Sequence, residues 1–224
     1  MEEYNLQEIR IEDYNSIKEY YQKRRPETAD SNILDLYIWL NCYPTWYFTN
    51  DKGLMWVAKS EDGQYYSSIP CCKDEDLKEC FLETQKYFNE VLQKKLVMYV
   101  VDKAAVDLLQ LPEDEYVVVP DRTYADYVYD AEKLRTFSGK KYHKKKNHLN
   151  AFKREYEGRY EFKFLSKKDE PEILAFLEDW KKHKSDTEEH KFIDSEAVGI
   201  KYILEHEEVF DYKIGAVYVD NKLE

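Results

Sequence analysis

The sequence predicts a mixed α/β (α+β) protein made of two repeats that a basic helix joins. A strand–helix–helix–strand–turn order occurs at about residues 6–53 and again at 160–222. Aromatic residues make up 16% of the 224 positions, which is enough for a real core and excludes intrinsic disorder. A cationic run separates the two copies, although the formal net charge of the chain is −12. We therefore expect a first repeat at 1–138, a joining helix at 139–158 and the start of a second, incomplete repeat at 159–224.

The first repeat is expected to alternate short strands with helices. A helix with a buried stripe at Tyr14, Ile17 and Tyr21 should end before Pro26, because the residue preceding a proline disfavours helical backbone. The next helix, at 32–42, is apolar on nearly all sides and is predicted to be buried. The other predicted elements are strands at 6–11, 46–49, 54–59, 64–69, 96–101, 116–119 and 124–129, helices at 74–94 and 103–109, and tight turns at 50–53 and 62–63.

The second repeat starts with a predicted strand at 160–165. Pro171 suits the first turn of the helix that follows. Asp194 or Ser195 can cap another helix, because both side chains accept hydrogen bonds from free N–H groups at a helix start. A strand at 212–219 then leads into a turn.

The joining segment concentrates positive charge. Residues 139–154 contain seven basic side chains and no acidic one. Tyr142, Leu149, Phe152 and Tyr156 fall on one helical seam, so this seam should pack while the cations point elsewhere. The candidate side chains for binding a donor or another polyanion are Lys140, Lys141, Lys144, Lys145, Lys146 and Arg154.

Several classes of protein are excluded or disfavoured. The acidic N-terminus has no apolar core for a signal peptide, and no stretch approaches the roughly 20 apolar residues of a membrane span. Glycines are too scattered for nucleotide-binding loops, and neither cysteines nor histidines have the spacing of a metal site, so no metal is expected. Cys71 and Cys72 suit buried thiols. We expect a soluble, cytoplasmic protein.

Four segments carry a family resemblance: DYVYDAEKLRTFSGKKYHKKKNHLNAFKREY at 126–156, SNILDLYIW at 31–39, LEDWKKHK at 177–184 and AVYVDNKLE at 216–224. With them the chain resembles the bacterial family named for the C-terminal domain of phosphatidylglycerol lysyltransferase, whose members carry two GCN5-related N-acetyltransferase-like folds in tandem. The resemblance implies acyl or aminoacyl transfer to an amine or hydroxyl, with acyl-CoA or aminoacyl-tRNA as donor. The best-understood relatives move an amino acid from aminoacyl-tRNA to a lipid head group, and they carry a membrane-spanning portion.

The turn at 69–74 indicates whether the first repeat can bind acyl-CoA as a donor. Acyltransferases of this fold hold a diphosphate in backbone N–H groups of a glycine-rich turn at a helix start. The corresponding turn at 69–74 has no glycine, Pro70 lacks an N–H, and acidic residues at 74–76 repel phosphate. The first repeat is therefore not expected to bind acyl-CoA in the usual way.

Three functions stay open at this point. The protein is an acyl or aminoacyl transferase whose basic helix holds tRNA or a phosphorylated small-molecule donor, or it is a non-catalytic tRNA- or polyanion-binding module with degenerate folds. In the third, the basic helix is only a solvated connection and the site lies elsewhere. No catalytic residue is identified, although Tyr124, Tyr127, Tyr129 and Tyr142 are candidates to line a pocket.

Overall fold

The computed structural model describes residues 4–24, 28–183 and 190–224. It is a mixed α+β structure with two small antiparallel sheets, which confirms the predicted class. The chain divides into two compact units: unit 1 is Met1–Ala125 with Asp186–Phe210, and unit 2 is Asp126–Ser185 with Asp211–Glu224. These units differ from the repeat boundaries expected from the sequence, because a helix near the end of the chain belongs to unit 1. The assignment of the repeats stays a prediction.

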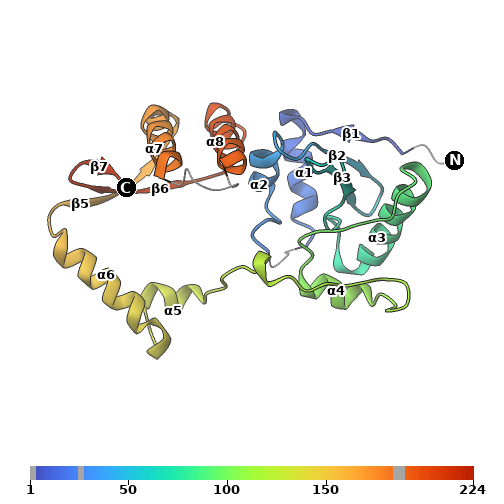
Figure 1. Ribbon diagram of the computed structural model, residues 1–224, viewed down its shortest axis with the longest axis horizontal. Coiled ribbons are helices and arrows are strands. Elements are labelled where there is room, and N and C mark those ends of the chain that lie inside the picture. Colours follow the sequence, from blue (N-terminus) through green and yellow to red (C-terminus); the bar gives the residue numbers. More distant parts are fainter. Residues whose placement is uncertain (1–3, 25–27, 184–189) are drawn as a thin grey trace. The chain divides into compact units, whose positions relative to one another are not determined.

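Unit 1 is built on a four-stranded sheet in the order β1-β2-β3-β4 (Figure 1). Its strands are β1 (Gln7–Glu8), β2 (Thr45–Thr49), β3 (Leu54–Lys59) and β4 (Tyr65–Tyr66). The predicted turn between β2 and β3 is confirmed, since Asn50 Oδ1 accepts hydrogen bonds from the N–H groups of Lys52 and Gly53 at 2.9 Å each. The strands expected at 6–11 and 64–69 are each reduced to two residues.

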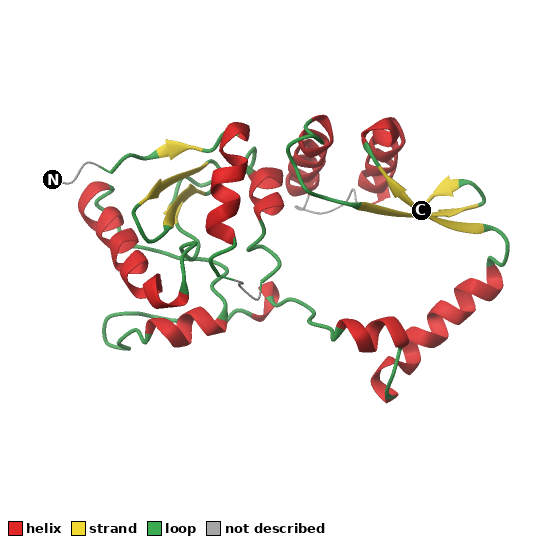
Figure 2. Cartoon of the chain, turned by 180° about the vertical axis from the view of Figure 1, so that it is seen from behind, coloured by secondary structure: helices red, strands yellow, loops and turns green. Residues whose placement is uncertain are grey.

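Helices cover both faces of this sheet. The helices of this unit are α1 (Tyr14–Tyr21), α2 (Ile33–Trp39), α3 (Leu77–Lys86), α4 (Lys103–Leu109) and α8 (His190–Glu205), of which α8 packs on α2. In both ribbon views α3 lies on one side of the strands and α1 and α2 on the other (Figures 1 and 2). Neighbouring residues of a strand face opposite ways, so Met55 and Val57 join the core with α3 while Trp56 meets Tyr21, with ring centroids 5.9 Å apart.

Helix α8 packs closely against α2. A Cβ atom at Gly199 would lie only 2.1 Å from the carbonyl oxygen of Ile38, so the glycine permits direct backbone contact. Nearby, the Asn41 side-chain amide donates a hydrogen bond to the carbonyl oxygen of Ser195 at 3.0 Å. The predicted cap at Asp194 or Ser195 is wrong, because α8 begins at His190 and both residues lie inside it.

Three strands predicted in the first repeat are wrong. The segment 96–101 forms only a single bridge, between Met98 and Ser67, and Val100 ends its extended run with a φ of 54°. The segments 116–119 and 124–129 pair with no strand in the parts of the chain that the structure describes, and most of their side chains are exposed. The helix expected at 74–94 is α3 followed by a π-helical turn at Tyr87–Val91.

Unit 2 contains the three-stranded sheet β5-β6-β7. Its elements are α5 (Ala131–Thr136), α6 (His143–Glu155), β5 (Tyr160–Leu165), α7 (Glu170–His183), β6 (Ile214–Val219) and β7 (Lys222–Leu223). Helix α7 is tied to the sheet by Tyr218, whose hydroxyl donates to the Glu172 carboxylate at 2.6 Å. The opposite face of β5 leaves Phe162 and Phe164 largely exposed, at 58% and 68%.

Helix α6 has the predicted seam, although it packs less deeply than expected. Tyr142, just before the helix, is buried, whereas Leu149, Phe152 and Tyr156 are half-buried. Phe152 contacts the ring of Tyr160 at a centroid distance of 5.2 Å. The expected packing of the seam is therefore only partial, since among the described residues Phe152 meets Tyr160 on β5, a strand at the edge of a small sheet.

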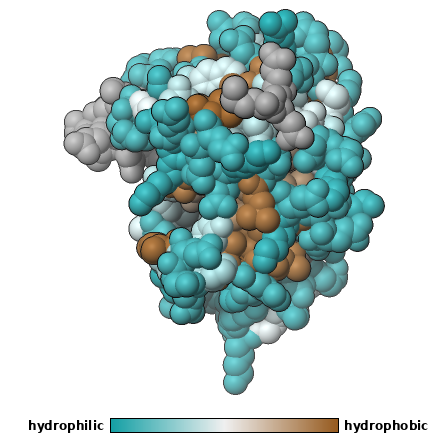
Figure 3. Space-filling view, turned by 90° about the vertical axis from the view of Figure 1, so that its right-hand side faces the viewer, coloured by the Kyte–Doolittle hydropathy of each residue, from teal (hydrophilic) through white to brown (hydrophobic). Residues whose placement is uncertain are grey.

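The molecular surface is mostly hydrophilic on the face shown in Figure 3, with hydrophobic side chains gathered near its middle. Over residues 4–24, 28–183 and 190–224, every helix is too short or too polar to cross a bilayer.

Candidate functional site

Unit 1 contains a cavity of about 700 Å³ on the side of the sheet that faces α1 and α2. Cavities of this size suit a small-molecule ligand. Nine of the lining residues are aromatic: Tyr20, Tyr21, Trp39, Tyr43, Trp56, Tyr66, Tyr99, Tyr124 and Phe192. Among the described residues, the charged groups of the lining are three carboxylates, Asp30, Asp35 and Asp62, and one guanidinium, Arg24.

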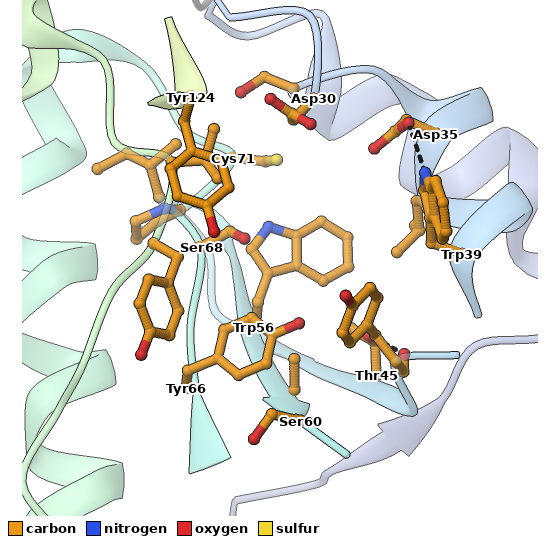
Figure 4. A pocket seen from close by; sticks show the side chains of 18 of the residues that line it. Asp30, Asp35, Trp39, Thr45, Trp56, Ser60, Tyr66, Ser68, Cys71 and Tyr124 are labelled. Carbon is orange, nitrogen blue, oxygen red and sulfur yellow. Dashed lines mark hydrogen bonds between the residues drawn. The ribbon is translucent and has the colours of Figure 1, made fainter. Parts of the chain in front are cut away.

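The floor of the cavity comes from the sheet. Trp56 and Ala58 point to the same face of β3, and the strand register sets Thr45 and Tyr66 opposite Ala58 on the two neighbouring strands. Figure 4 shows Trp56 at the centre of the pocket, with Tyr66 and Tyr124 on one side of it and Trp39 on the other.

The wall formed by α2 carries a charged group in an apolar sequence. Asp35 lies in the first turn of α2, and its carboxylate accepts a hydrogen bond from the Trp39 indole N–H at 3.1 Å (Figure 4). Burial, with a smaller contribution from the charge of Asp30, raises the Asp35 pKa to about 6, and the Trp39 hydrogen bond opposes this. The helix was expected to be buried all round, but Asp35, Leu36 and Trp39 line the cavity instead.

Arg24 lies in the lining but is already neutralised. Its Nη2 atom donates to both carboxylate oxygens of Asp102, at 2.7 and 2.8 Å, and its Nε atom donates to Asp74 at 3.1 Å. The Asp102 carboxylate also caps α4 by accepting from the N–H of Ala105 at 2.9 Å. Two carboxylates therefore compensate one guanidinium, and the charge left at the pocket is negative.

Four further ionisable groups of the lining have shifted pKa values. Burial raises the pKa of Tyr43 and of Tyr66 to about 12, so both stay neutral phenols. Burial likewise raises the pKa of the Cys71 thiol to about 12, which removes it as a thiolate nucleophile at neutral pH. In contrast, a hydrogen bond from the Ser60 hydroxyl lowers the pKa of Asp62 and keeps this carboxylate ionised.

The basic side chains predicted from the sequence lie in unit 2. Lys140, Lys141, Lys144, Lys145, Lys146 and Arg154 are all exposed. None of the six forms an ion pair within the ranges that the structure describes. Lys145 lies 5.0 Å from the ring centroid of Tyr129, and Lys141 lies 5.1 Å from that of Tyr142. The exposure of Lys140, Lys144 and Arg154 agrees with the predicted orientation of the helix.

Other residues singled out in the sequence lie apart from the pocket. Of the four candidate tyrosines only Tyr124 lines it; Tyr127 and Tyr129 stack on each other in unit 2 at 6.5 Å, and Tyr142 is buried there. His206 Nδ1 donates to the Tyr202 carbonyl oxygen at 2.8 Å, and the side chains of His183 and His190 are outside the described residues. Among the described residues no group of three His, Cys, Asp or Glu side chains is arranged to hold a metal ion.

Sequence reasoning missed Asp35 and Trp56, which are central to the pocket. A signal for Asp35 was present, because it is the one charged residue in the apolar segment ILDLYIW. No local pattern marks Trp56, since both faces of β3 are buried and its sequence has no alternation.

Comparison with known proteins adds a family and two relatives. The family described as "Phosphatidylglycerol lysyltransferase, C-terminal" matches residues 21–224. A solved structure of a conserved protein of unknown function from Bacteroides thetaiotaomicron is similar with a TM-score of 0.85 and 25% identity, over 99% of this chain and 73% of that one. An uncharacterised protein of Mycoplasmoides gallisepticum is 28% identical over 100 residues, which span 45% of this chain and 32% of the relative.

Proposed function

Because the chain belongs to the family of phosphatidylglycerol lysyltransferase C-terminal domains, we propose that it is an acyl or aminoacyl transferase. The observation that carries this proposal is the cavity of about 700 Å³ in unit 1, which gives a member of a transferase family a place for a small substrate. Transfer would depend mainly on holding a nucleophile near an activated carbonyl and stabilising its oxyanion.

The donor in this proposal is aminoacyl-tRNA or acyl-CoA. Two features favour aminoacyl-tRNA. The six exposed cations at α6 are not neutralised by neighbouring acids and can attract a polyanion. In unit 1, Asp74 occupies the helix start where a diphosphate would bind, and Arg24, the cation beside it, is held by Asp74 and Asp102.

We also propose that the chain contains two GCN5-related N-acetyltransferase-like repeats. The order β1-α1-α2-β2-β3 recurs as β5-α7-α8-β6-β7, with a short 3-10 turn before α1 and before α7. This repetition of five elements supports the proposal.

The experiment follows label from radioactive aminoacyl-tRNA, or from radioactive acetyl-CoA, into a mixture of amine and hydroxyl acceptors. Tyr66→Ala removes a pocket side chain, and Tyr65→Ala is its matched control, because Tyr65 is the adjacent residue of β4 and packs against the core on the other face. We expect transfer that falls at least about 10-fold in Tyr66→Ala and much less in Tyr65→Ala, with circular dichroism showing that both are folded. Absence of transfer from both donors would contradict the transferase proposal.

A second candidate is a non-catalytic tRNA- or polyanion-binding module, and the exposed cations at α6 favour it. Labelled tRNA should then bind with an affinity that falls steeply with salt, because each neutralised phosphate releases counterions. Reversing the charge of Lys140, Lys144 and Arg154 together should abolish binding without unfolding the protein, since all three are exposed. Fluorescence anisotropy measures this, and equal, weak binding by both proteins would contradict it. Binding without transfer would favour this candidate over the enzyme.

A further inference from the structure

We propose that the cavity of unit 1 is a recognition site for a small organic cation, a molecule that carries a primary or quaternary ammonium group. This inference rests on the proposed function, since it names the class of substrate that the same cavity would take. It is argued from the rings, the carboxylates and the neutralised guanidinium of the lining.

The rings provide the first part of the recognition. Trp56, Tyr66 and Trp39 come from different elements and surround one space (Figure 4). The face of an aromatic ring is the negative end of its quadrupole, so a cation placed over it is attracted, most strongly over tryptophan. Several rings around one cavity make the arrangement by which proteins hold alkylammonium groups.

The carboxylates provide the second part. Asp35 comes from α2, Asp30 from the loop before it, and Asp62 from the turn before β4. None of the three forms an ion pair with a residue in the described ranges 4–24, 28–183 and 190–224. Burial and the charges of Asp30 and of Glu196 on α8 raise the pKa of Asp35 to about 6, and no cation paired with its carboxylate in those ranges offsets them. A bound ammonium group would supply that cation and lower the pKa of Asp35.

The same lining is unfavourable for an anion. Arg24, the single cation among the lining residues that the structure describes, has its guanidinium occupied by Asp102 and Asp74. Phenolic hydroxyls can donate single hydrogen bonds, but three carboxylates raise the cost of bringing a negative charge into this partly desolvated space. The cavity is also much larger than an ammonium group alone, so the ligand should have an apolar body that contacts the remaining rings.

The test uses intrinsic fluorescence, since two of the four tryptophans, Trp39 and Trp56, line the cavity. The probes are tetramethylammonium and cadaverine, and glutarate is the anionic comparison. We expect saturable changes with both cations and none with glutarate. Asp35→Asn keeps the acceptor for Trp39 but removes the charge, and should weaken cation binding about 10-fold or more. Asp114→Asn, an exposed aspartate outside the cavity lining, is the matched control and should leave the affinity unchanged.

The pH dependence gives an independent measurement. Cation affinity of the wild type should fall as the pH is lowered through about 6, because Asp35 becomes protonated, whereas Asp35→Asn should lack this change. Equal affinity of wild type and Asp35→Asn, stronger binding of glutarate, or no binding of either cation would overturn the proposal. Cation binding without label transfer would contradict the transferase proposal and leave the proposed cation site standing. Transfer that neither cation inhibits would contradict the proposed cation site and leave the transferase proposal standing.

Discussion

Removing the carboxylate of Asp102 should be among the most destabilising single changes in unit 1. The side chains of Arg24 and Asp102 are only 7% and 2% exposed, and two hydrogen bonds of 2.7 and 2.8 Å join them. Breaking a buried pair by removing one partner costs about 3–5 kcal/mol, because the other charge stays buried. Asp102 also caps α4, which adds about 1 kcal/mol. We therefore expect Asp102→Ala to cost about 4–6 kcal/mol.

Urea unfolding measures this cost, and two further variants test the reasoning. Asp107→Ala removes the carboxylate of an exposed pair with Lys103, whose side chains are 83% and 62% exposed, and should cost little. The double variant Arg24→Met with Asp102→Asn removes both charges of the buried pair and keeps a cap, so it should be more stable than Asp102→Ala. A cost below about 1 kcal/mol for Asp102→Ala, or no difference from Asp107→Ala, would refute the argument.

Three other predictions concern packing and pH. Gly199→Ala should destabilise the protein by about 1–3 kcal/mol in thermal or urea unfolding, because the new Cβ atom would lie 2.1 Å from the carbonyl oxygen of Ile38. The control is Val198→Ala, a change at an exposed neighbour, and equal small effects of the two variants would contradict the close contact of α8 with α2. Phe152→Ala should cost on the order of 1 kcal/mol, since Phe152 is half-buried, and Lys144→Ala almost nothing; equal effects in unfolding experiments would indicate a solvated helix. The pKa of Asp35, raised to about 6, means that its protonation stabilises the fold below about pH 4 and that this contribution is lost as the pH rises through 6. Asp35→Asn should thus gain stability relative to wild type between pH 4 and pH 7, by on the order of 1 kcal/mol after screening by solvent, and a constant difference in melting temperature would contradict this.

Local signals in the sequence predicted the elements that local chemistry determines. The turn at 50–53 followed from Asn50 and Gly53, and the helix expected at 103–109 coincides with α4, where Asp102 is a good cap. The strand predicted at 96–101 does not form, because an apolar run specifies burial and an extended backbone but not a strand partner. Its extended backbone is interrupted at Val100, where no sequence rule forecasts a positive φ.

The basic cluster could be read from the sequence because its members are neighbours along one helix. The cavity could not, because it draws lining residues from positions as far apart as Tyr20 and Phe192. Such a site depends on tertiary packing, and the only local sign of it was one aspartate inside an apolar helix.

The placement of α8 in unit 1 has a consequence for how the protein is made. Phe210, at the end of the second stretch of that unit, meets the rings of Tyr14 and Tyr37 at 5.0 and 5.1 Å, and Phe192 completes the cavity wall. Residues 126–210 must therefore leave the ribosome before unit 1 can close. At roughly 5–20 residues per second this is a wait of roughly 4–17 seconds, during which α2 lacks its partner helix and its apolar surface is open to chaperones.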